Sequence, residues 1–212
     1  MHADEDGTQL HCAVKKGDAE MVRALLSSDK VSEAMVHAVD EDGWTVLHCA
    51  VEKGDAEMVR ALLSSDKVSE AMVHAVDEDG WTVLHCAVEK GDAEMVRALL
   101  SSDKVSEAMV GAVDEDGWTV LHCAVEKGDA EMVRALLSSD KVSEAMVGAA
   151  DLEGRTALHY AAYYGHTETA RALLSSDKVN LAMANAVDKK GKSPRDLAWL
   201  YPNILKFLTD LS

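Results

Sequence analysis

The apolar and polar positions of residues 40–63 predict two short helices joined by tight turns. Residues 40–43 are turn-favouring acids and a glycine, and Thr45 follows as a suitable N-cap. The next apolar run is expected to form a first helix that ends at Gly54, where glycine accepts the left-handed conformation. Asp55 then caps a second helix. The stripe that this helix is expected to bury consists of Met58, Val59, Leu62 and Leu63.

This pattern returns every 37 residues, the spacing between His48 and His85, so the chain is a tandem array. Two short helices cannot bury enough apolar surface alone, so neighbouring units must stack. We expect a single domain over residues 1–212. Its units are an N-terminal capping repeat (1–39), three near-identical repeats (40–76, 77–113 and 114–150), a divergent repeat (151–187) and a C-terminal half-repeat cap (188–212).

The segments that join the repeats are expected to contain further helical turns. In residues 64–76, Ser65 or Asp66 could cap one extra helical or 3₁₀ turn, because apolar residues follow at helical spacing. In the half-repeat cap, Ser193 and Pro194 are expected to open a helix and Pro202 to start the last one. Trp199 is expected to be buried there.

The repeat resembles the ankyrin repeat family, whose pattern is D-x-x-G-x-T-P-L-H-x-A-A-x-x-G-H-x-E-x-V-x-x-L-L. From Asp40 this chain reads D-E-D-G-W-T-V-L-H-C-A-V-E-K-G-D-A-E-M-V-R-A-L-L. It departs from the pattern at Val46, where the family has proline, and its spacer is longer than that of the usual repeat of about 33 residues. The resemblance implies an all-α helix-turn-helix solenoid with β-turn tips, and we add a short helical turn in each spacer.

The resemblance also implies a concave recognition surface made of the turn tips and the first helices. Carried over to this chain, its residues are Glu41, Asp42, Trp44, Glu52, Lys53, Glu78, Asp79, Trp81, Glu89, Lys90, Glu115, Asp116, Trp118, Glu126, Lys127, Leu152, Glu153, Arg155, Tyr163 and Tyr164. In the family, the Thr and His of the motif bond the backbone of their own and neighbouring turns. The residues implied to have this structural role are Thr45, His48, Thr82, His85, Thr119, His122, Thr156 and His159.

Three tryptophans in register would form an aromatic ladder flanked by acids, suited to a basic or amphipathic partner. The rings could instead fold onto the next turn and shield the stack, and the sequence leaves both alternatives open. The near-identity of the repeats weakens the case for recognition, since a surface tuned to one irregular partner should vary from repeat to repeat.

The net charge of −17 narrows the choice of partners. Each central repeat carries eight acidic and three basic residues, whereas residues 188–212 carry five basic and three acidic ones. An acidic surface repels phosphate backbones, so we expect no nucleic-acid partner. The acidity could also serve only to keep copies of the protein apart in solution, and on that interpretation we expect a monomer.

Four cysteines occupy equivalent positions on the first helices, namely Cys12, Cys49, Cys86 and Cys123. A disulfide needs Cα atoms about 4.4–6.8 Å apart, but packed helices lie roughly 8–10 Å apart, so we expect no disulfide. We expect these residues to be small core side chains, as in a reducing cytosol. The neighbouring histidines raise a metal alternative, but adjacent helical side chains diverge by about 100°, so no metal or cofactor is expected.

No constellation of catalytic residues interrupts the period, so we expect no enzymatic activity. No apolar segment suggests a signal peptide or a membrane span, and we expect a cytoplasmic protein, or one in a host cytosol if it is an effector. The function favoured is a non-catalytic protein-interaction module or scaffold. The alternative is a structural or engineered repeat scaffold without a dedicated partner, because natural duplication and consensus engineering would both leave near-identical repeats.

Overall fold

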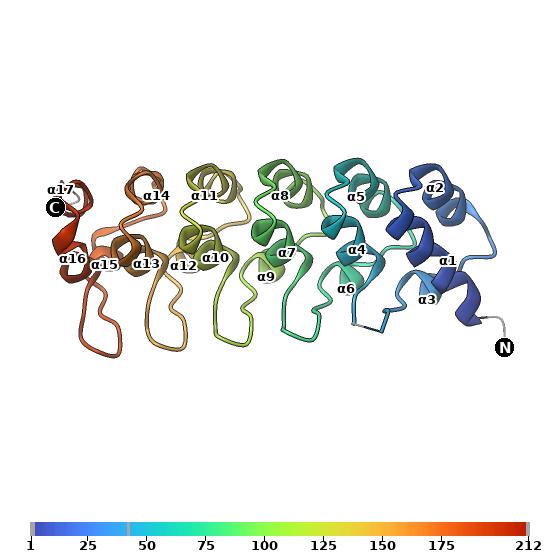
Figure 1. The fold of residues 1–212 in the computed structure, drawn as a ribbon, viewed down its shortest axis with the longest axis horizontal. Helices are drawn as coiled ribbons and strands as arrows, with labels where there is room; N and C mark the ends of the chain where they lie inside the picture. Colours follow the sequence, from blue (N-terminus) through green and yellow to red (C-terminus); the bar gives the residue numbers. More distant parts are fainter. Residues whose placement is uncertain (1–2, 42, 211–212) are drawn as a thin grey trace. The chain divides into compact units, whose positions relative to one another are not determined.

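The computed structural model describes residues 3–41 and 43–210, with side chains from Gln9 onward. Every regular element in these ranges is a helix, and the backbone otherwise pairs only at isolated bridges. These bridges are Val39–Thr45, Val76–Thr82 and Ala150–Thr156. The expected all-α fold of stacked helix pairs is therefore confirmed (Figure 1). The chain divides into two compact units, residues 1–109 and 110–212.

The first unit stacks three helix pairs. Its helices are α1 (Ala3–Lys16), α2 (Ala19–Ser27), α3 (Glu33–Val36), α4 (Val46–Glu52), α5 (Ala56–Leu63), α6 (Glu70–Val73), α7 (Val83–Glu89), α8 (Ala93–Leu100) and the start of α9 (Glu107–Val110). The first helices α1, α4 and α7 pack side by side in one row, and the second helices α2, α5 and α8 pack in another (Figure 1). The predicted stripe of α5 is buried, since Met58, Val59 and Leu62 are fully covered.

The second unit repeats this arrangement and ends it. Its helices are α10 (Val120–Glu126), α11 (Ala130–Leu137), α12 (Glu144–Val147), α13 (Ala157–Tyr164), α14 (Thr167–Leu174), α15 (Leu181–Asn185), α16 (Pro194–Leu197), the 3₁₀ turn η1 (Ala198–Leu200) and α17 (Pro202–Asp210). Here α10, α13 and α16 form one row, and α11, α14 and α17 form the other. Ser193 caps α16 and Pro202 begins α17, as predicted.

Each turn tip is held by its first aspartate. The Asp40 Oδ1 atom accepts a hydrogen bond from the backbone N–H of Trp44 at 2.9 Å, and the Gly43 N–H bonds the Asp40 carbonyl oxygen at 3.1 Å. Gly43 has φ +76°, a conformation that L side chains rarely adopt. The repeats that begin at Asp77, Asp114 and Asp151 show the same aspartate bond to the fifth residue.

The N-terminal repeat departs from this turn. Residues 4–7 belong to α1 and are helical, although they match the turn residues of the later repeats in composition. Ala3 stands where the later repeats have the aspartate that accepts the turn's hydrogen bond, and Asp6 stands where they have the left-handed glycine. Without those two residues the hydrogen bond and the left-handed conformation that make the turn are missing. The segment is therefore helical, and α1 is 14 residues long.

The extra turn predicted in the spacer is present, but with another cap. Glu70–Val73 forms α6, and the Ser69 hydroxyl accepts the Met72 N–H at 3.4 Å. The predicted cap Ser65 instead accepts the Lys67 N–H at 3.3 Å, within the preceding turn. Helix α6 starts later than predicted because the residues before Ser69 belong to the second helix and to this turn. Met72 and Val73 then close the edge of the core.

Two predictions of burial were wrong. Trp199 is 72% exposed, because the three-residue 3₁₀ turn buries Ala198 and directs the following indole outward. In this cap Ile204 and Leu208 of α17 are buried instead. Cys12 is exposed, whereas the other three cysteines are buried. In its repeat no earlier first helix packs against that side of α1.

Candidate protein-binding surface

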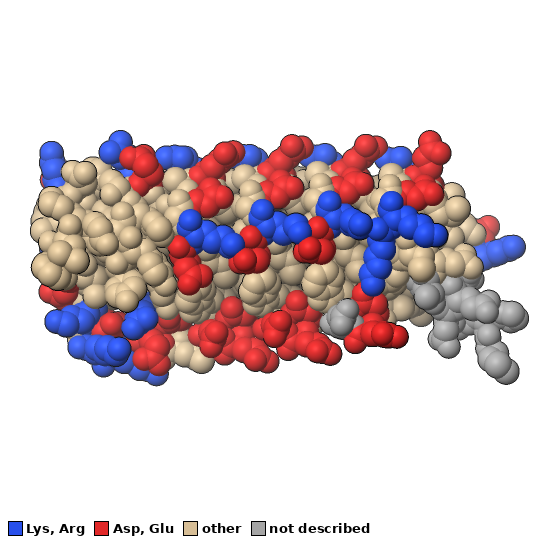
Figure 2. All heavy atoms as spheres, viewed as in Figure 1, with Lys and Arg blue, Asp and Glu red and all other residues tan. Residues whose placement is uncertain are grey.

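The turn tips present an acidic edge. All their predicted residues that the structure describes are exposed, and Asp42 lies outside the described residues. Figure 2 shows acidic side chains along the tips in both units. In the second unit the backbone also links successive tips, since the Leu152 N–H bonds the Asp116 carbonyl oxygen at 3.3 Å. This hydrogen bond joins neighbouring tips through their backbones, and the side chains face the solvent.

The three predicted tryptophans are half-buried and lie on histidines of their own repeats. Ring centroids are 6.3 Å apart for Trp44 and His48, 6.4 Å for Trp81 and His85, and 6.3 Å for Trp118 and His122, with tilts of 31–36°. Each ring therefore covers a buried imidazole and leaves part of its area accessible. Both alternatives for these side chains hold in part, because the rings shield the stack and still expose apolar surface.

Below each ring, the Thr and His of the motif form a buried network. The Thr45 hydroxyl accepts the His48 N–H at 3.3 Å, and His48 Nδ1 accepts the Thr45 N–H at 3.3 Å. Because the Trp81 carbonyl oxygen can only accept, His48 Nε2 donates to it at 3.3 Å. Equivalent donors reach the carbonyl oxygens of Trp44, Arg155 and Lys192 from His11, His122 and His159. This network joins neighbouring repeats, as the family resemblance implied.

Burial keeps these imidazoles neutral. The pKa values of His48, His122 and His159 are lowered chiefly by desolvation, and the backbone acceptors oppose that shift only in part. A neutral ring with its proton on Nε2 matches the observed bonds, because Nδ1 must accept from the threonine N–H. The histidines therefore support the surface from beneath and are not available to a partner.

Acids and bases at the ends of the first helices are exposed and partly paired. In the first unit, Lys90 Nζ lies 2.7 Å from Glu52 Oε1, and Lys15 Nζ lies 2.9 Å from Asp40 Oδ2. These pairs link neighbouring repeats at the solvent, where screening limits their contribution to stability. The charges remain within reach of a partner.

A recess of about 220 Å³ opens beside Trp44. Its walls include Asp40, Cys49, Glu52 and the flanking lysines Lys15 and Lys53. The indole contributes apolar surface to the recess, and the two carboxylates contribute negative charge. The ammonium group of Lys15 already approaches one of these carboxylates, so a lysine-sized cation fits this environment.

The equivalent surface of the divergent repeat is aromatic. Tyr163 is 62% exposed and Tyr164 is 40% exposed, with ring centroids 5.1 Å apart. The Tyr164 hydroxyl donates to Glu126 at 3.4 Å. Sequence reasoning missed Tyr160, whose ring packs edge-on 4.8 Å from Trp118 and whose hydroxyl donates to Asp151 at 2.6 Å. The sequence could have indicated Tyr160 by its position, because it replaces the cysteine that recurs there in the earlier repeats.

Trp44→Ala is expected to lower the free energy of unfolding by only about 1–2 kcal/mol, because the ring is half-buried and contributes packing on His48 without a hydrogen bond. Chemical denaturation followed by circular dichroism measures this difference. A loss as large as that of a fully buried tryptophan would mean that the ring is a structural component, and it would remove the basis for an accessible aromatic surface.

Burial, together with nearby acids, raises the pKa of Cys86 to about 12, so its thiolate is suppressed. Cys12, Cys49, Cys86 and Cys123 form no disulfide bond with one another. Within residues 3–41 and 43–210, no group of three or more His, Cys, Asp and Glu is arranged to hold a metal ion. No helix in that part of the chain is long and apolar enough to cross a membrane.

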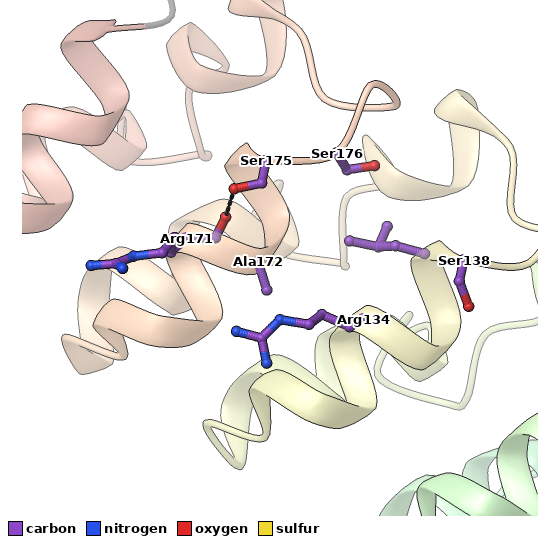
Figure 3. A pocket seen from close by; sticks show the side chains of 7 residues that line it. Arg134, Ser138, Arg171, Ala172, Ser175 and Ser176 are labelled. Carbon is purple, nitrogen blue, oxygen red and sulfur yellow. Dashed lines mark hydrogen bonds between the residues drawn. The ribbon is translucent and has the colours of Figure 1, made fainter.

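A second hollow lies away from the predicted surface, between the second helices α11 and α14. It encloses about 360 Å³ and is lined by Arg134, Leu137, Arg171, Ala172 and three serines. Figure 3 shows both arginines reaching out on the same side, while the Ser175 hydroxyl donates to the Arg171 carbonyl oxygen at 2.7 Å. The hollow is shallow and its floor is mainly aliphatic.

These observations define a class of protein: an all-α array of helix pairs, with β-turn tips held by aspartate and glycine and repeats joined by a Thr–His network. A family model described as ankyrin repeats (3 copies) matches residues 1–71, 68–146, 105–184 and 141–211. The chain belongs to the ankyrin repeat family. Members of this family typically bind proteins and are generally non-catalytic.

Solved structures support the same fold. An ankyrin repeat domain from Acinetobacter baumannii AYE is 24% identical with a TM-score of 0.78, and the match covers 96% of this chain and 97% of that one. A second structure, described as an ankyrin repeat protein, is 22% identical with a TM-score of 0.77 and the same coverage. At such identities the likeness establishes the fold alone. A search of curated proteins gives no match.

Proposed function

We propose that the chain is a non-catalytic protein-interaction module whose turn tips and first helices bind a basic or amphipathic segment of a partner protein. The observation that carries this proposal is the recess beside Trp44, which the indole lines together with Asp40 and Glu52. An indole face attracts cations, and the flanking carboxylates add charge of the right sign. An aliphatic or aromatic side chain of the partner would pack on the accessible part of the ring.

The contacts inside the first unit illustrate what such a partner would do. Lys15 bonds Asp40, and Lys90 bonds Glu52. A partner's lysine or arginine would compete with these two side chains for carboxylates that are already placed next to tryptophan. The pair of Lys90 and Glu52 lies at the solvent, so separating it costs little, whereas the Asp40 side chain is only 14% exposed.

The test uses a fluorescently labelled amphipathic peptide that alternates lysine and leucine, with fluorescence anisotropy as the readout. We expect the triple variant Trp44→Ala, Trp81→Ala, Trp118→Ala to bind at least about tenfold more weakly than the unaltered chain, since aromatic anchors dominate such interfaces. Trp199→Ala is the matched control, because this tryptophan is exposed but lies outside the proposed surface. Its affinity should be unchanged.

Equal affinities of the triple variant and the unaltered chain would contradict the proposal. Failure of the unaltered chain to bind the peptide would favour the alternative function, a natural or engineered repeat scaffold without a dedicated partner. The near-identity of residues 40–76, 77–113 and 114–150 is the observation that supports this alternative. Location in a cytosol and a monomeric state remain predictions, which fractionation and sedimentation would measure.

A further inference from the structure

The second unit contains a pocket whose charge is opposite to that of the acidic repeats. It encloses about 150 Å³ between α13 and the turn that precedes α16. Three cationic side chains line it, together with two tyrosines and one carboxylate. These residues are Arg155, Lys190, Lys192, Tyr160, Tyr163 and Asp188.

The single carboxylate of this pocket is already engaged. Asp188 Oδ1 accepts the backbone N–H groups of Lys190 at 2.8 Å and Lys192 at 2.9 Å, and these bonds, that of Lys192 foremost, lower the pKa of Asp188. Its Oδ2 lies 3.9 Å from Arg155 Nε. One negative charge thus faces three positive ones. The lysine side chains extend into solvent, and the pocket has an excess of positive charge.

The tyrosines give the pocket apolar walls. The Arg155 guanidinium carbon lies 5.8 Å from the centroid of the Tyr160 ring, so the ring holds the cation at the back of the pocket. Tyr163 stands at the rim and is 62% exposed. Figure 2 shows basic side chains gathered around the turn tip near α16, whereas the tip that precedes α10 is acidic.

The residues that line this pocket differ from those at the equivalent positions one repeat earlier. One repeat earlier, the positions of Arg155, Tyr160 and Tyr163 are occupied by tryptophan, cysteine and glutamate. Lys190 and Lys192 correspond to Glu153 and Arg155. At these positions Tyr163 replaces Glu126 and Lys190 replaces Glu153, so acidic side chains give way to an aromatic ring and a cation.

We propose that this pocket binds an acidic segment of a partner protein, with a carboxylate side chain against Arg155, Lys190 and Lys192 and a neighbouring apolar side chain on Tyr163. The guanidinium and two ammonium groups match a carboxylate in charge and in hydrogen-bond donors. A small inorganic anion would use the cations but not the exposed ring, whereas a peptide uses both. This inference goes beyond the proposed function, because it adds Lys190 and Lys192 to the site and assigns a partner segment of the opposite charge.

The test measures the anisotropy of a short labelled peptide that alternates glutamate and leucine, at low ionic strength. We expect the double variant Lys190→Gln, Lys192→Gln to bind at least about tenfold more weakly than the unaltered chain, because both cations face the bound carboxylate. Tyr163→Ala is expected to weaken binding by about threefold or more, with little change in salt dependence. A peptide in which glutamine replaces glutamate should bind poorly.

Lys16→Gln combined with Lys206→Gln is the matched control, because both lysines are exposed, lie outside the pocket and change the net charge equally. Equal weakening by this control would overturn the proposal, since it would show that only overall charge matters. Inorganic phosphate that displaces the peptide at comparable concentration would also overturn it. The double variant Trp44→Ala, Trp81→Ala, which leaves the contact between Trp118 and Tyr160 intact, should bind the acidic peptide normally, so this proposal and the proposed function can fail separately.

Discussion

Leu47→Ala is expected to lower the free energy of unfolding by about 3–5 kcal/mol, the largest effect that a single core truncation should have in this chain. Leu47 is fully buried in α4, which packs against α1 on one side and α7 on the other. The truncation removes apolar contacts at both interfaces and leaves a cavity that rigid neighbouring helices cannot close. Urea denaturation, with the midpoint compared at an unchanged slope, measures the difference.

Leu10→Ala is the matched control for this prediction. Leu10 occupies the equivalent position in α1 and is equally buried, but in this chain α1 has a neighbouring first helix on one side only. We expect a smaller loss, about 2–3 kcal/mol, because only one interface between repeats is weakened. Equal losses for the two variants would show that the coupling between repeats does not set the stability.

Acidification from neutral pH to about pH 5 is expected to destabilise the fold substantially, because three buried histidines must remain neutral. The pKa values of His48, His122 and His159 are lowered from 6.5 in the folded chain, mainly by desolvation. Below pH 6.5 the unfolded chain therefore binds more protons than the folded one. Stability is fully present above that value and is lost as the pH falls toward the lowered folded pKa values.

Thermal unfolding measured at intervals between pH 7.5 and about pH 5 tests this dependence. Replacing His48 with glutamine removes one titrating group, so we expect a lower stability at neutral pH but a shallower decline on acidification. A stability that stays constant over this range would contradict the lowered pKa values of the buried histidines.

The helix boundaries could be predicted because their causes are local. Thr45 and Asp55 cap helices by accepting the N–H groups of residues three positions further on, and Gly54 ends a helix through its own φ of +69°. Each of these effects involves residues within one turn, so a single repeat contains the information. The same reasoning explains the one turn that is missing, because the N-terminal repeat lacks the residues that make it.

The candidate surface was predictable only in part. Position within the repeat placed the turn residues and first-helix ends correctly at the solvent, because a periodic sequence presents the same faces in each repeat. That position could not predict that the Trp44 ring packs on His48 of its own repeat or that the Trp199 ring points outward. Arg155 and Tyr163 were predicted as surface residues, but the pocket that they form with Lys190 and Lys192 was not, because it combines side chains from two repeats that resemble each other poorly.

The sequence by itself determined the period, the all-α repeat fold, the caps and the sign of the surface charge. Each depends on the nature of residues close together along the chain or on their repetition. Only the tertiary structure decided how far each ring is covered, which charges are paired and where a positive pocket opens. These features depend on distances between side chains about one repeat apart, as between Lys90 and Glu52, and those distances are set by how helices pack.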